Sequence, residues 1–396
     1  MTKNDDKRVP VLRFKGFNDD WAQRELRELA NIGDGLHGTP TYIDNSKYFF
    51  INGNNLVNDK IRITSETKKI SFSQLSKSDK ALNNLTLLMS INGTIGQLAF
   101  YNGENIKLGK SIAYIIFYSK NNFEFFYGVL KTPNIQRYFQ RHVTGTTIKN
   151  LGLAELRNFK YPIPSEKEQE KIGKTIILIN KIIVLQQRKA KRLKLLKKAM
   201  LQDLFTDKNV PKLRFNGFDA NWIQCKLEKE ALLTMGQSPS GSTYSDQPST
   251  YILVQGNADL KNGWVKPRIW TTQITKLAKK GDIIITVRAP AGKVGRTNFD
   301  VVLGRGVASI QGNDFIFYLL SKMDINKYWK KYAAGSTFES INSNDIKNTR
   351  VHVPNLSEQN RIANLFLRLD DLIRFQQNKL NNLQKTKQFL LQNMFI

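Results

Sequence analysis

Two long stretches of the chain, residues 165–205 and 357–395, carry apolar residues at every third and fourth position, and both lack proline and glycine after their first few turns. In a seven-residue repeat labelled a to g, the a and d positions form one apolar seam in each stretch. The d positions are Ile172, Ile179, Gln186, Leu193, Met200 and Ile362, Leu369, Gln376, Leu383, Leu390; the a positions are Ile176, Ile183, Ala190, Lys197, Leu204 and Phe366, Ile373, Leu380, Lys387, Met394. Each stretch is therefore predicted to form one long helix.

The two seams are interrupted at matching places, where Gln186 corresponds to Gln376 and Lys197 corresponds to Lys387. A polar residue inside a seam costs stability but can fix the register of a helix pair. If the helices run antiparallel, the two glutamines approach each other and can exchange hydrogen bonds, so we assign them a role in register. A shared antiparallel helix pair is our main interpretation. Packing of each helix on its own globular domain is the alternative.

Shorter apolar runs, closed by glycine or Asn-Gly signals, precede each long helix. Runs of this length that are rich in β-branched and aromatic residues predict strands and hairpins. They cover residues 48–51, 85–91 and 112–117 in the first half and 251–254, 283–287 and 301–303 in the second. Two further apolar segments, 125–130 and 315–320, are predicted to be helical. The predicted fold class is α+β, with two β-rich domains joined by two long antiparallel coiled-coil helices.

The chain contains a similar sequence twice. Residues 12–17 (LRFKGF), followed by Trp21, reappear as residues 213–218 (LRFNGF), followed by Trp222, at an offset of 201 residues. Near the end of each half, Gly-Thr-Thr at 145–147, Pro164 and Glu-Gln at 168–169 correspond to Gly-Ser-Thr at 335–337, Pro354 and Glu-Gln at 358–359, at an offset of 190. Two similar halves in one polypeptide predict an internal pseudo-two-fold repeat.

This repeat divides the chain into five predicted parts. Residues 1–20 form a leading strip that packs on the long helices, and residues 21–163 form the first β-rich domain. Residues 164–206 form the central spacer helix, 207–354 a second leading strip with the second β-rich domain, and 355–396 the C-terminal spacer helix.

The charge of the chain points to a polyanionic partner. Its 61 Lys and Arg against 33 Asp and Glu give a formal net charge of +28, and the pI is about 10.0. Basic proteins of this kind bind nucleic acid by neutralising phosphates and releasing counterions. No apolar run is long enough to span a membrane, and the polar start has no secretory signal. A single cysteine, Cys225, excludes an internal disulfide and a Cys-based zinc cluster, so we expect a cytoplasmic protein.

Two segments resemble nucleotide-binding motifs, but neither meets the structural requirements. Residues 33–38 match G-x-G-x-x-G, yet Thr39-Pro40-Thr41 follows where a helix should begin. Residues 103–111 have five residues between the glycines of a phosphate-loop pattern that requires four. The three histidines, His37, His142 and His352, lack the spacing of metal ligands and are predicted to be surface or packing residues.

The remaining candidates are polar side chains near glycines in loops, which suit readout of DNA base edges together with phosphate contacts. Ordinary solvation is the alternative for each one alone. They are His37, Thr39, Thr41, Asn52, Asn54, Asn55, Lys110, Thr146, Thr147, Lys149 and Asn150 in the first half, and Gln237, Ser240, Ser242, Thr243, Tyr244, Gln255, Asn257, Arg288, Lys293, Arg296, Arg305, Ser336 and Thr337 in the second.

Further cations recur in both halves or crowd one helix. Arg13 and Arg214 correspond, as do Lys110 and Arg305, and Arg137 and Lys327. Seven cations without an acid among them lie on the first long helix: Arg188, Lys189, Lys191, Arg192, Lys194, Lys197 and Lys198. Contact with spacer phosphates and a merely solvated helix face are both open for this run.

The duplicated order of leading strip, β-rich region, Gly-Thr/Ser-Thr loop, Pro-x-x-x-Glu-Gln and long helix resembles the specificity subunit of type I restriction–modification enzymes. The resemblance covers nearly the whole chain. It implies that each β-rich region is a target-recognition domain that reads one half of a bipartite site in double-stranded DNA. It also implies that the antiparallel helices set the half-site separation and dock two methyltransferase subunits, and that the strips lie against the opposite helix bundle.

The same resemblance implies that this chain has no active site of its own. Restriction subunits with motor activity would join for cleavage of foreign DNA. S-adenosylmethionine, ATP and magnesium would belong to the partner subunits, and this chain would bind no cofactor and no metal.

Two functions of other classes remain as alternatives at this stage. One is a stand-alone basic nuclease or recombinase with a cryptic active site, which would cleave DNA with Mg²⁺ in the absence of partners. The other is an assembly scaffold with incidental charge, which would bind DNA without sequence preference.

Overall fold

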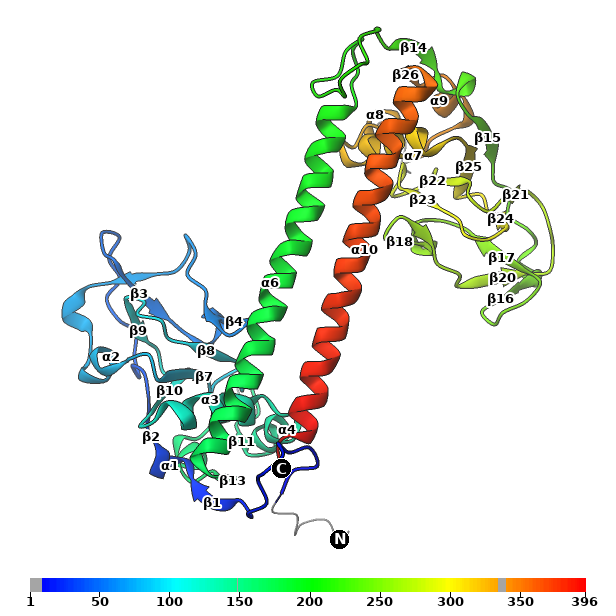
Figure 1. Ribbon diagram of the computed structural model, residues 1–396. Helices are drawn as coiled ribbons and strands as arrows, with labels where there is room; N and C mark the ends of the chain where they lie inside the picture. The colour runs from blue at the N-terminus through cyan, green and yellow to red at the C-terminus, as the bar shows by residue number, and fades with distance from the viewer. Residues whose placement is uncertain (1–8, 148, 334–339) are drawn as a thin grey trace. The chain divides into compact units, whose positions relative to one another are not determined.

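Two long helices dominate the computed structural model, which describes residues 9–147, 149–333 and 340–396 (Figure 1). Helix α6 covers Glu166–Leu204 and helix α10 covers Leu356–Asn393. Both begin and end within two residues of the ranges predicted from the apolar seam. The chain is of mixed helix and sheet, as predicted.

The chain divides into two compact units, and each contains one β-rich region with a part of each long helix. Unit 1 comprises Met1–Gln187 and Asn378–Ile396, and unit 2 comprises Arg188–Gln377. The five predicted domain boundaries are finer than this division and stay predictions. We describe each unit by itself.

Unit 1 contains a four-stranded sheet in the order β2-β10-β7-β8 and a three-stranded sheet in the order β6-β3-β9. The strands of these sheets are β2 Ala30–Asp34, β3 Tyr48–Ile51, β6 Lys69–Ile70, β7 Thr86–Ser90, β8 Leu98–Phe100, β9 Ile106–Leu108 and β10 Ile112–Phe117. Two-stranded pairs are β1 Ala22–Glu25 with β13 Lys160–Ile163, β4 Leu56–Val57 with β5 Lys60–Ile61, and β11 Val143–Thr144 with β12 Asn150–Leu151. The helices are α1 Leu26–Leu29, α2 Lys77–Ala81, α3 Lys120–Lys131, α4 Pro133–Arg141 and α5 Leu153–Arg157.

Unit 2 contains a six-stranded sheet in the order β15-β25-β22-β23-β19-β18 and a five-stranded sheet in the order β16-β20-β17-β24-β21. The six are β15 Leu232–Met235, β18 Leu260–Lys261, β19 Trp264–Val265, β22 Ile283–Thr286, β23 Val294–Arg296 and β25 Val307–Gln311. The five are β16 Tyr244–Ser245, β17 Tyr251–Val254, β20 Ile269–Thr271, β21 Leu277–Ala278 and β24 Val301–Leu303. Strand β14 Ile223–Lys226 pairs with β26 Arg350–Val353, and the helices are α7 Asp314–Ile325, α8 Lys330–Ala333 and α9 Ser343–Lys347.

The predicted strands and short helices are confirmed in both units. The six apolar runs coincide with β3, β7, β10, β17, β22 and β24, and the two helical segments lie within α3 and α7. The two units also share a strand arrangement, because β10 lies between β2 and β7 as β25 lies between β15 and β22. The duplication in the sequence therefore extends to the topology.

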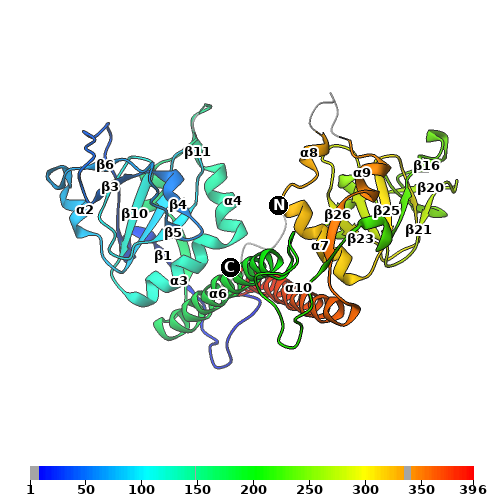
Figure 2. The same ribbon diagram turned by 90° about the horizontal axis from the view of Figure 1, so that it is seen from above.

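Helix α3 packs between the four-stranded sheet of unit 1 and α6 (Figure 2). Phe125, Phe126 and Tyr127 are fully buried there, in one core with Ile172 and Ile176. A Cβ atom on Gly173 would overlap Glu124 and the backbone of Phe125, so glycine permits this close approach.

The apolar seam is buried within each unit. In unit 1, Ile179 and Ile183 of α6 pack with Leu380 of α10, while Ile172 and Ile176 share a core with Met394. In unit 2, Leu201 and Leu204 share a core with Ile362, Phe366 and Leu369. Within each unit the two helix segments therefore run antiparallel. Gln186 belongs to unit 1 and Gln376 to unit 2, so their proposed meeting stays a prediction.

Each leading strip is attached to the ends of both long helices of its own unit. The Leu12 N–H donates to Asn393 O (2.7 Å), and the Leu213 N–H donates to Asp203 O (2.9 Å). Each strip is thus hydrogen-bonded to a long helix of its own unit, while its predicted place against the opposite helix bundle stays a prediction.

The expectation that Arg13 and Arg214 serve recognition is wrong. Arg13 pairs with Glu168 at 2.7 Å and Arg214 with Glu358 at 2.8 Å, and only 14% and 13% of the two arginine side chains are exposed. These repeated arginines fix the strips to the helices, and their charge is paired within their own unit.

Candidate nucleic-acid interface

The candidate residues of unit 1 come from separate loops that backbone hydrogen bonds tie together. The Leu36 N–H donates to Leu108 O (2.8 Å), and the Lys110 N–H donates back to Leu36 O (2.9 Å). The Gly109 N–H donates to Ile51 O (2.9 Å), and the Gly53 N–H donates to Ser111 Oγ (2.9 Å). The loops after β2, β3 and β9 therefore meet at one edge of the sheets.

The hairpin formed by β11 and β12 joins the same edge. The Gly93 N–H donates to Lys149 O (2.9 Å), the Leu151 N–H donates to Ile91 O (2.8 Å), and Asn92 forms a β-bridge with Asn150. We call this assembly the unit 1 loop cluster, comprising residues 35–41, 52–55, 92–94, 109–111, 144–147, 149 and 150.

Unit 2 builds the same arrangement from its own loops. The Gln237 N–H donates to Leu303 O (2.9 Å), as Leu36 does to Leu108, and the Gly304 N–H donates to Val254 O (2.8 Å), as Gly109 does to Ile51. Arg288 forms a bridge with Ser340, which repeats the contact of Asn92 with Asn150. We call residues 236–244, 255–257, 288–292, 304–306, 340 and 341 the unit 2 loop cluster.

A glycine at the same place in each cluster allows the backbones to approach. A Cβ atom on Gly35 would overlap Leu108 O, and one on Gly236 would overlap Gly304 O. Residues 36–41 form no helix after β2, so the segment 33–38 lacks the helix that a dinucleotide site requires. Of its glycines, Gly35 serves close packing between loops.

Most candidate side chains within the described residues face solvent. The exposed ones are His37, Thr39, Thr41, Asn52, Asn54, Lys110, Thr146, Thr147, Lys149, Asn150, Gln237, Ser240, Ser242, Asn257, Arg288, Lys293 and Arg305, and the half-buried ones are Asn55, Thr243, Tyr244, Gln255 and Arg296. Ser336 and Thr337 lie outside the described residues. The exposed side chains are available to a ligand at each cluster.

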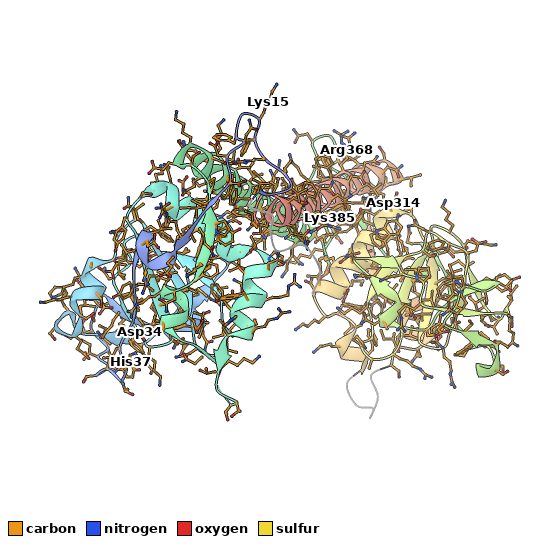
Figure 3. The ribbon with its side chains drawn as sticks, turned by 90° about the horizontal axis from the view of Figure 1, so that it is seen from below. Lys15, Asp34, His37, Asp314, Arg368 and Lys385 are labelled. Atoms are coloured by element: carbon orange, nitrogen blue, oxygen red, sulfur yellow. The ribbon has the colours of Figure 1, made fainter. Side chains whose placement is uncertain are left out.

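Some of the candidate polar groups are already engaged within the loops. Asn52 Oδ1 accepts from the Asn54 N–H (3.0 Å), and Asn55 Nδ2 donates to Arg62 O (2.9 Å), so these two amides shape the loop. His37 Nε2 lies 2.5 Å from Asp34 Oδ2, and 70% of its side chain is exposed. Figure 3 shows Asp34 and His37 together, on the side of unit 1 away from Lys15.

The serine- and threonine-rich loop of unit 2 is internally bonded in a similar way. Thr243 Oγ1 donates to Ser240 O (2.7 Å), and the hydroxyl groups of Ser240 and Ser242 lie 2.9 Å apart. Tyr244 donates to Pro239 O (3.2 Å). These contacts link the side chains of the loop to one another and to its own backbone.

The candidate cations differ in their availability. Lys293 pairs with Asp324 at 2.8 Å, and Arg296 pairs with Asp314 beneath the ring of Phe317. Lys110, Lys149, Arg288 and Arg305 have no ion pair with any residue that the structure describes. The latter four are the stronger candidates for phosphate contacts.

The cation-rich run of the first long helix lies in the unit 2 part of α6. Six of its seven cations are exposed. The seventh, Lys197, donates to Asp370 Oδ1 (2.6 Å) and lies 5.1 Å from the ring centroid of Tyr318. The six exposed cations are thus free of the helix seam.

A second cationic surface, on α4, was not among the predicted sites. Tyr138 and Arg141 of this helix, and His142 directly after it, lie with the noted Arg137 around one pocket. Their spacing of three and four residues, with Ile135 and Phe139 buried on the other face, was the available signal.

Two features are absent from the described residues. None of the helices found there combines the length and apolar character needed to cross a membrane. Nor do three or more His, Cys, Asp or Glu side chains gather as metal ligands in the described ranges.

The chain belongs to the family described as "Type I restriction modification DNA specificity domain", which it matches over residues 18–195 and 234–385. The Methanocaldococcus jannaschii protein named "Putative type I restriction enzyme MjaX specificity subunit" is 27% identical over 94% of this chain and 92% of its own length. The MjaIX specificity subunit of the same organism is 29% identical over 46% of each chain.

Solved structures share the fold. A type I restriction–modification S subunit from M. genitalium covers 98% of this chain and 99% of its own, with a TM-score of 0.65 and 15% identity. A chain from a study of assembly and conformational transition of the type I restriction–modification system covers 95% and 97%, with a TM-score of 0.58 and 20% identity. The predicted family is confirmed: this chain is a DNA-recognition subunit of the type I class. The stand-alone nuclease or recombinase is not supported.

Proposed function

We propose that this subunit reads a bipartite DNA target, with the unit 1 loop cluster on one half-site and the unit 2 loop cluster on the other. The observation that carries the proposal is the repeated hydrogen-bond pattern of the two clusters. Each presents exposed donors and acceptors at one edge of a sheet, in a chain with a net charge of +28. Base edges need such groups for direct readout, and phosphates need the unpaired cations.

The two clusters share a framework but differ in their side chains. Leu36 and Gln237 occupy the same hydrogen-bonded position, and Lys110 and Arg305 each follow a glycine of the cluster, Gly109 and Gly304. A common backbone with different side chains is suited to reading two different sequences. We therefore expect an asymmetric target.

Helices α6 and α10 would act together as an antiparallel coiled coil that sets the separation of the half-sites. They would also dock two methyltransferase subunits, one for each repeat. Exposed apolar side chains on these helices support such docking, since Leu185, Leu195, Leu372 and Phe375 are 53–66% exposed. Restriction subunits with motor activity would join this core.

Catalysis would reside in the partners, and this chain would act in the cytoplasm without an active site. S-adenosylmethionine would bind to the methyltransferase subunits, and ATP and magnesium would serve the methyltransferase–restriction assembly rather than this chain. The family relationship supports this division of labour.

Selection from random DNA duplexes tests the proposal. The subunit, purified with its methyltransferase partners, should enrich two short specified sequences separated by a spacer of fixed length, and binding should weaken steeply between about 50 and 200 mM salt. One continuous motif, or no motif, would contradict it. DNA cleavage by this chain alone with Mg²⁺ would support the nuclease alternative.

A further inference from the structure

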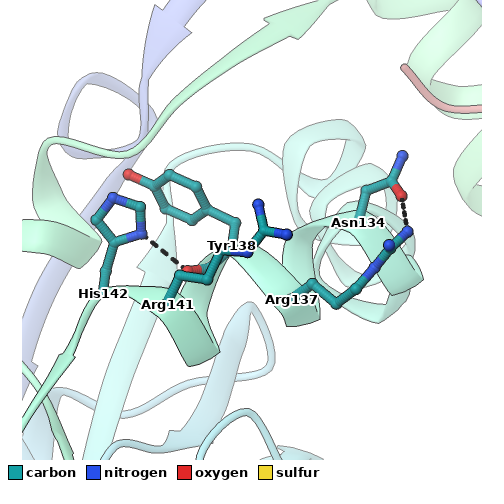
Figure 4. A pocket seen from close by; sticks show the side chains of 5 residues that line it. All are labelled: Asn134, Arg137, Tyr138, Arg141 and His142. Atoms are coloured by element: carbon teal, nitrogen blue, oxygen red, sulfur yellow. Dashed lines mark hydrogen bonds between the residues drawn. The ribbon is translucent and has the colours of Figure 1, made fainter.

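One face of helix α4 in unit 1 gathers cations and aromatic rings around a shallow pocket of about 260 Å³ (Figure 4). Asn134, Arg137, Tyr138, Arg141 and His142 line it. Thr132 caps the helix and Pro133 occupies its first turn, so the backbone of this segment is fixed locally.

The opposite face of α4 packs on the unit 1 core and contacts the loop segment that directly follows cluster residues 92–94. Ile135 and Phe139 are buried in the core, and Gln136 Nε2 donates to Gly96 O (3.3 Å) in the loop that follows Thr94. His142 leads directly into the β11–β12 hairpin, whose Lys149 carbonyl belongs to the cluster. The cationic face therefore adjoins the cluster and holds a fixed position beside it.

The charges on this face are oriented but not neutralised. Arg137 Nη2 donates to Asn134 Oδ1 (2.7 Å), and Arg141 has no ion pair or hydrogen bond with the residues that the structure describes. Two arginines four residues apart repel each other, which costs helix stability unless an anion lies between them.

The two rings complete the face. His142 Nδ1 donates to Tyr138 O (2.8 Å), which leaves Nε2 facing outward, and the two ring centroids are 4.0 Å apart. Burial, followed by the nearby carboxylate of Glu155, raises the pKa of Tyr138, so its hydroxyl remains a donor at neutral pH.

Unit 2 carries the same pattern of cations and rings 190 residues later. This is also the offset between the Gly-Thr-Thr loop at 145–147 and its counterpart at 335–337. Lys327, Tyr328, Lys331 and Tyr332 occupy the positions of Arg137, Tyr138, Arg141 and His142. Lys331 Nζ lies 3.8 Å from the ring centroid of Tyr328 and 4.9 Å from that of Tyr332.

The local backbone of the second copy is different. Lys327 has a φ of +55° in the turn between α7 and α8, where unit 1 has a continuous helix. Asp324 replaces Asn134, and its carboxylate pairs with Lys293. The pattern of cations and rings is kept, although a turn and the short helix α8 present it in place of one helix.

We propose that the α4 face, and its counterpart around Lys331, bind the sugar–phosphate backbone of DNA beside each half-site. This inference rests on the proposed function. Arginine forks match phosphate oxygens in geometry and charge, while contacts to phosphate fix position without reading sequence. The shallow, open pocket also suits a backbone that passes over it better than an enclosed small molecule.

The double variant Arg137→Ala/Arg141→Ala tests the inference in the complex with the methyltransferase subunits. The probes are a duplex carrying the motif mapped from methylated genomic DNA and a scrambled duplex of equal length. Affinity for both should fall about tenfold or more at low salt, and the slope of log K against log salt should become shallower by about two. Arg137→Lys/Arg141→Lys should keep most of the slope.

The matched control is Lys15→Ala/Lys167→Ala, which removes two exposed cations at the leading strip and the start of α6. It should leave the salt slope unchanged. Unchanged affinity and slope in the α4 variant, with intact folding, would overturn the inference, as would a loss of methyltransferase assembly without a loss of DNA affinity. If the wild-type complex does not distinguish the motif from the scrambled duplex, the proposed function itself fails.

Discussion

Arg13 donates two hydrogen bonds to the carboxylate of Glu168, from Nε at 2.7 Å and from Nη2 at 2.8 Å, and the two residues are 155 positions apart in the sequence. Its Nη2 also donates to Asp19 O (2.6 Å), which closes the strip on itself. Only 1% of the Glu168 side chain is exposed. Arg214 repeats the pair with Glu358, so one buried ion pair fixes each leading strip to the first turn of a long helix.

We predict that Arg13→Met destabilises unit 1 by about 3 kcal/mol, because it leaves the buried Glu168 carboxylate without its partner. Hydrogen–deuterium exchange resolved by peptide should show faster exchange at the strip and the start of α6. The double variant Arg13→Met/Glu168→Met should recover part of the loss. Arg24→Met, which breaks an exposed pair with Glu28 at 3.7 Å, should change little. Equal effects of Arg13→Met and Arg24→Met would contradict this account.

The glycines of the loop clusters give a second prediction. Gly35→Ala should disrupt the unit 1 cluster, because the new methyl group would overlap Leu108 O, and Gly236→Ala should do the same in unit 2. Each should weaken binding to a DNA duplex that carries the motif mapped from methylated genomic DNA by tenfold or more. Gly38→Ala and Gly241→Ala are the controls, since no atom lies within 4 Å of their added Cβ atoms. Indistinguishable binding by test and control variants would show that the close approach has no role.

The two seam lysines should respond differently to replacement by methionine. Lys197→Met removes the partner of Asp370 and should cost about 1 kcal/mol, a modest value because that carboxylate is 35% exposed. Lys387 donates instead to Asn180 Oδ1 (2.8 Å), and the nearby Asp59 retains Lys131. Lys387→Met should therefore be nearly neutral in urea unfolding. A larger cost for Lys387→Met than for Lys197→Met would contradict this.

Lys387 also makes the stability of the folded protein depend on pH. Burial lowers the pKa of Lys387 below its ordinary value of 10.5. The unfolded chain then binds more protons than the folded chain at pH values just below 10.5, so this group makes stability rise with pH there. Lys387→Met should lack that contribution, which unfolding of both proteins at several pH values between 8 and 10 measures. Parallel stability curves for the two proteins would refute it.

Cys225 should be a poorly reactive thiol. Burial, followed by the charge of Glu230, raises its pKa to about 11, and the thiol donates to Glu230 Oε1 at 3.5 Å. At pH 8 about one thiol in a thousand is then ionised, and alkylation by iodoacetamide should accelerate about tenfold per pH unit up to pH 10. Glu230→Gln should speed the reaction and Lys229→Ala should slow it. A rate that levels off near pH 9 would contradict the raised pKa.

The sequence carried enough information for the elements that depend on local pattern. The period of the apolar seam located α6 and α10 to within two residues, and short β-branched runs located β3, β10, β17 and β24. These features follow from side chains close in sequence, whose spacing dictates which face is buried. The sequence similarity of the two halves likewise predicted their common strand topology.

Contacts between distant residues were beyond such reasoning. Nothing near Asp59 in the sequence shows that its carboxylate accepts a hydrogen bond from Tyr127 (2.9 Å) and lies beside Asn180 of α6. Arg13 and Arg214 are of a residue type that commonly binds phosphate, and only the fold reveals Glu168 and Glu358 beside them. The role of each loop candidate stays a prediction, because base contacts depend on a DNA position that neither the sequence nor the fold specifies.

Mapping methylated bases in genomic DNA from cells that carry this subunit with altered loop clusters tests the central claim most directly. One variant carries Asn54→Ala with Lys110→Ala in unit 1, and the other carries Gln237→Ala with Arg305→Ala in unit 2. We predict a bipartite methylated motif in the wild type, with relaxed specificity in only one half for each variant and in opposite halves for the two. Relaxation of the same bases by both variants, or a methylated motif that persists without the subunit, would contradict the account.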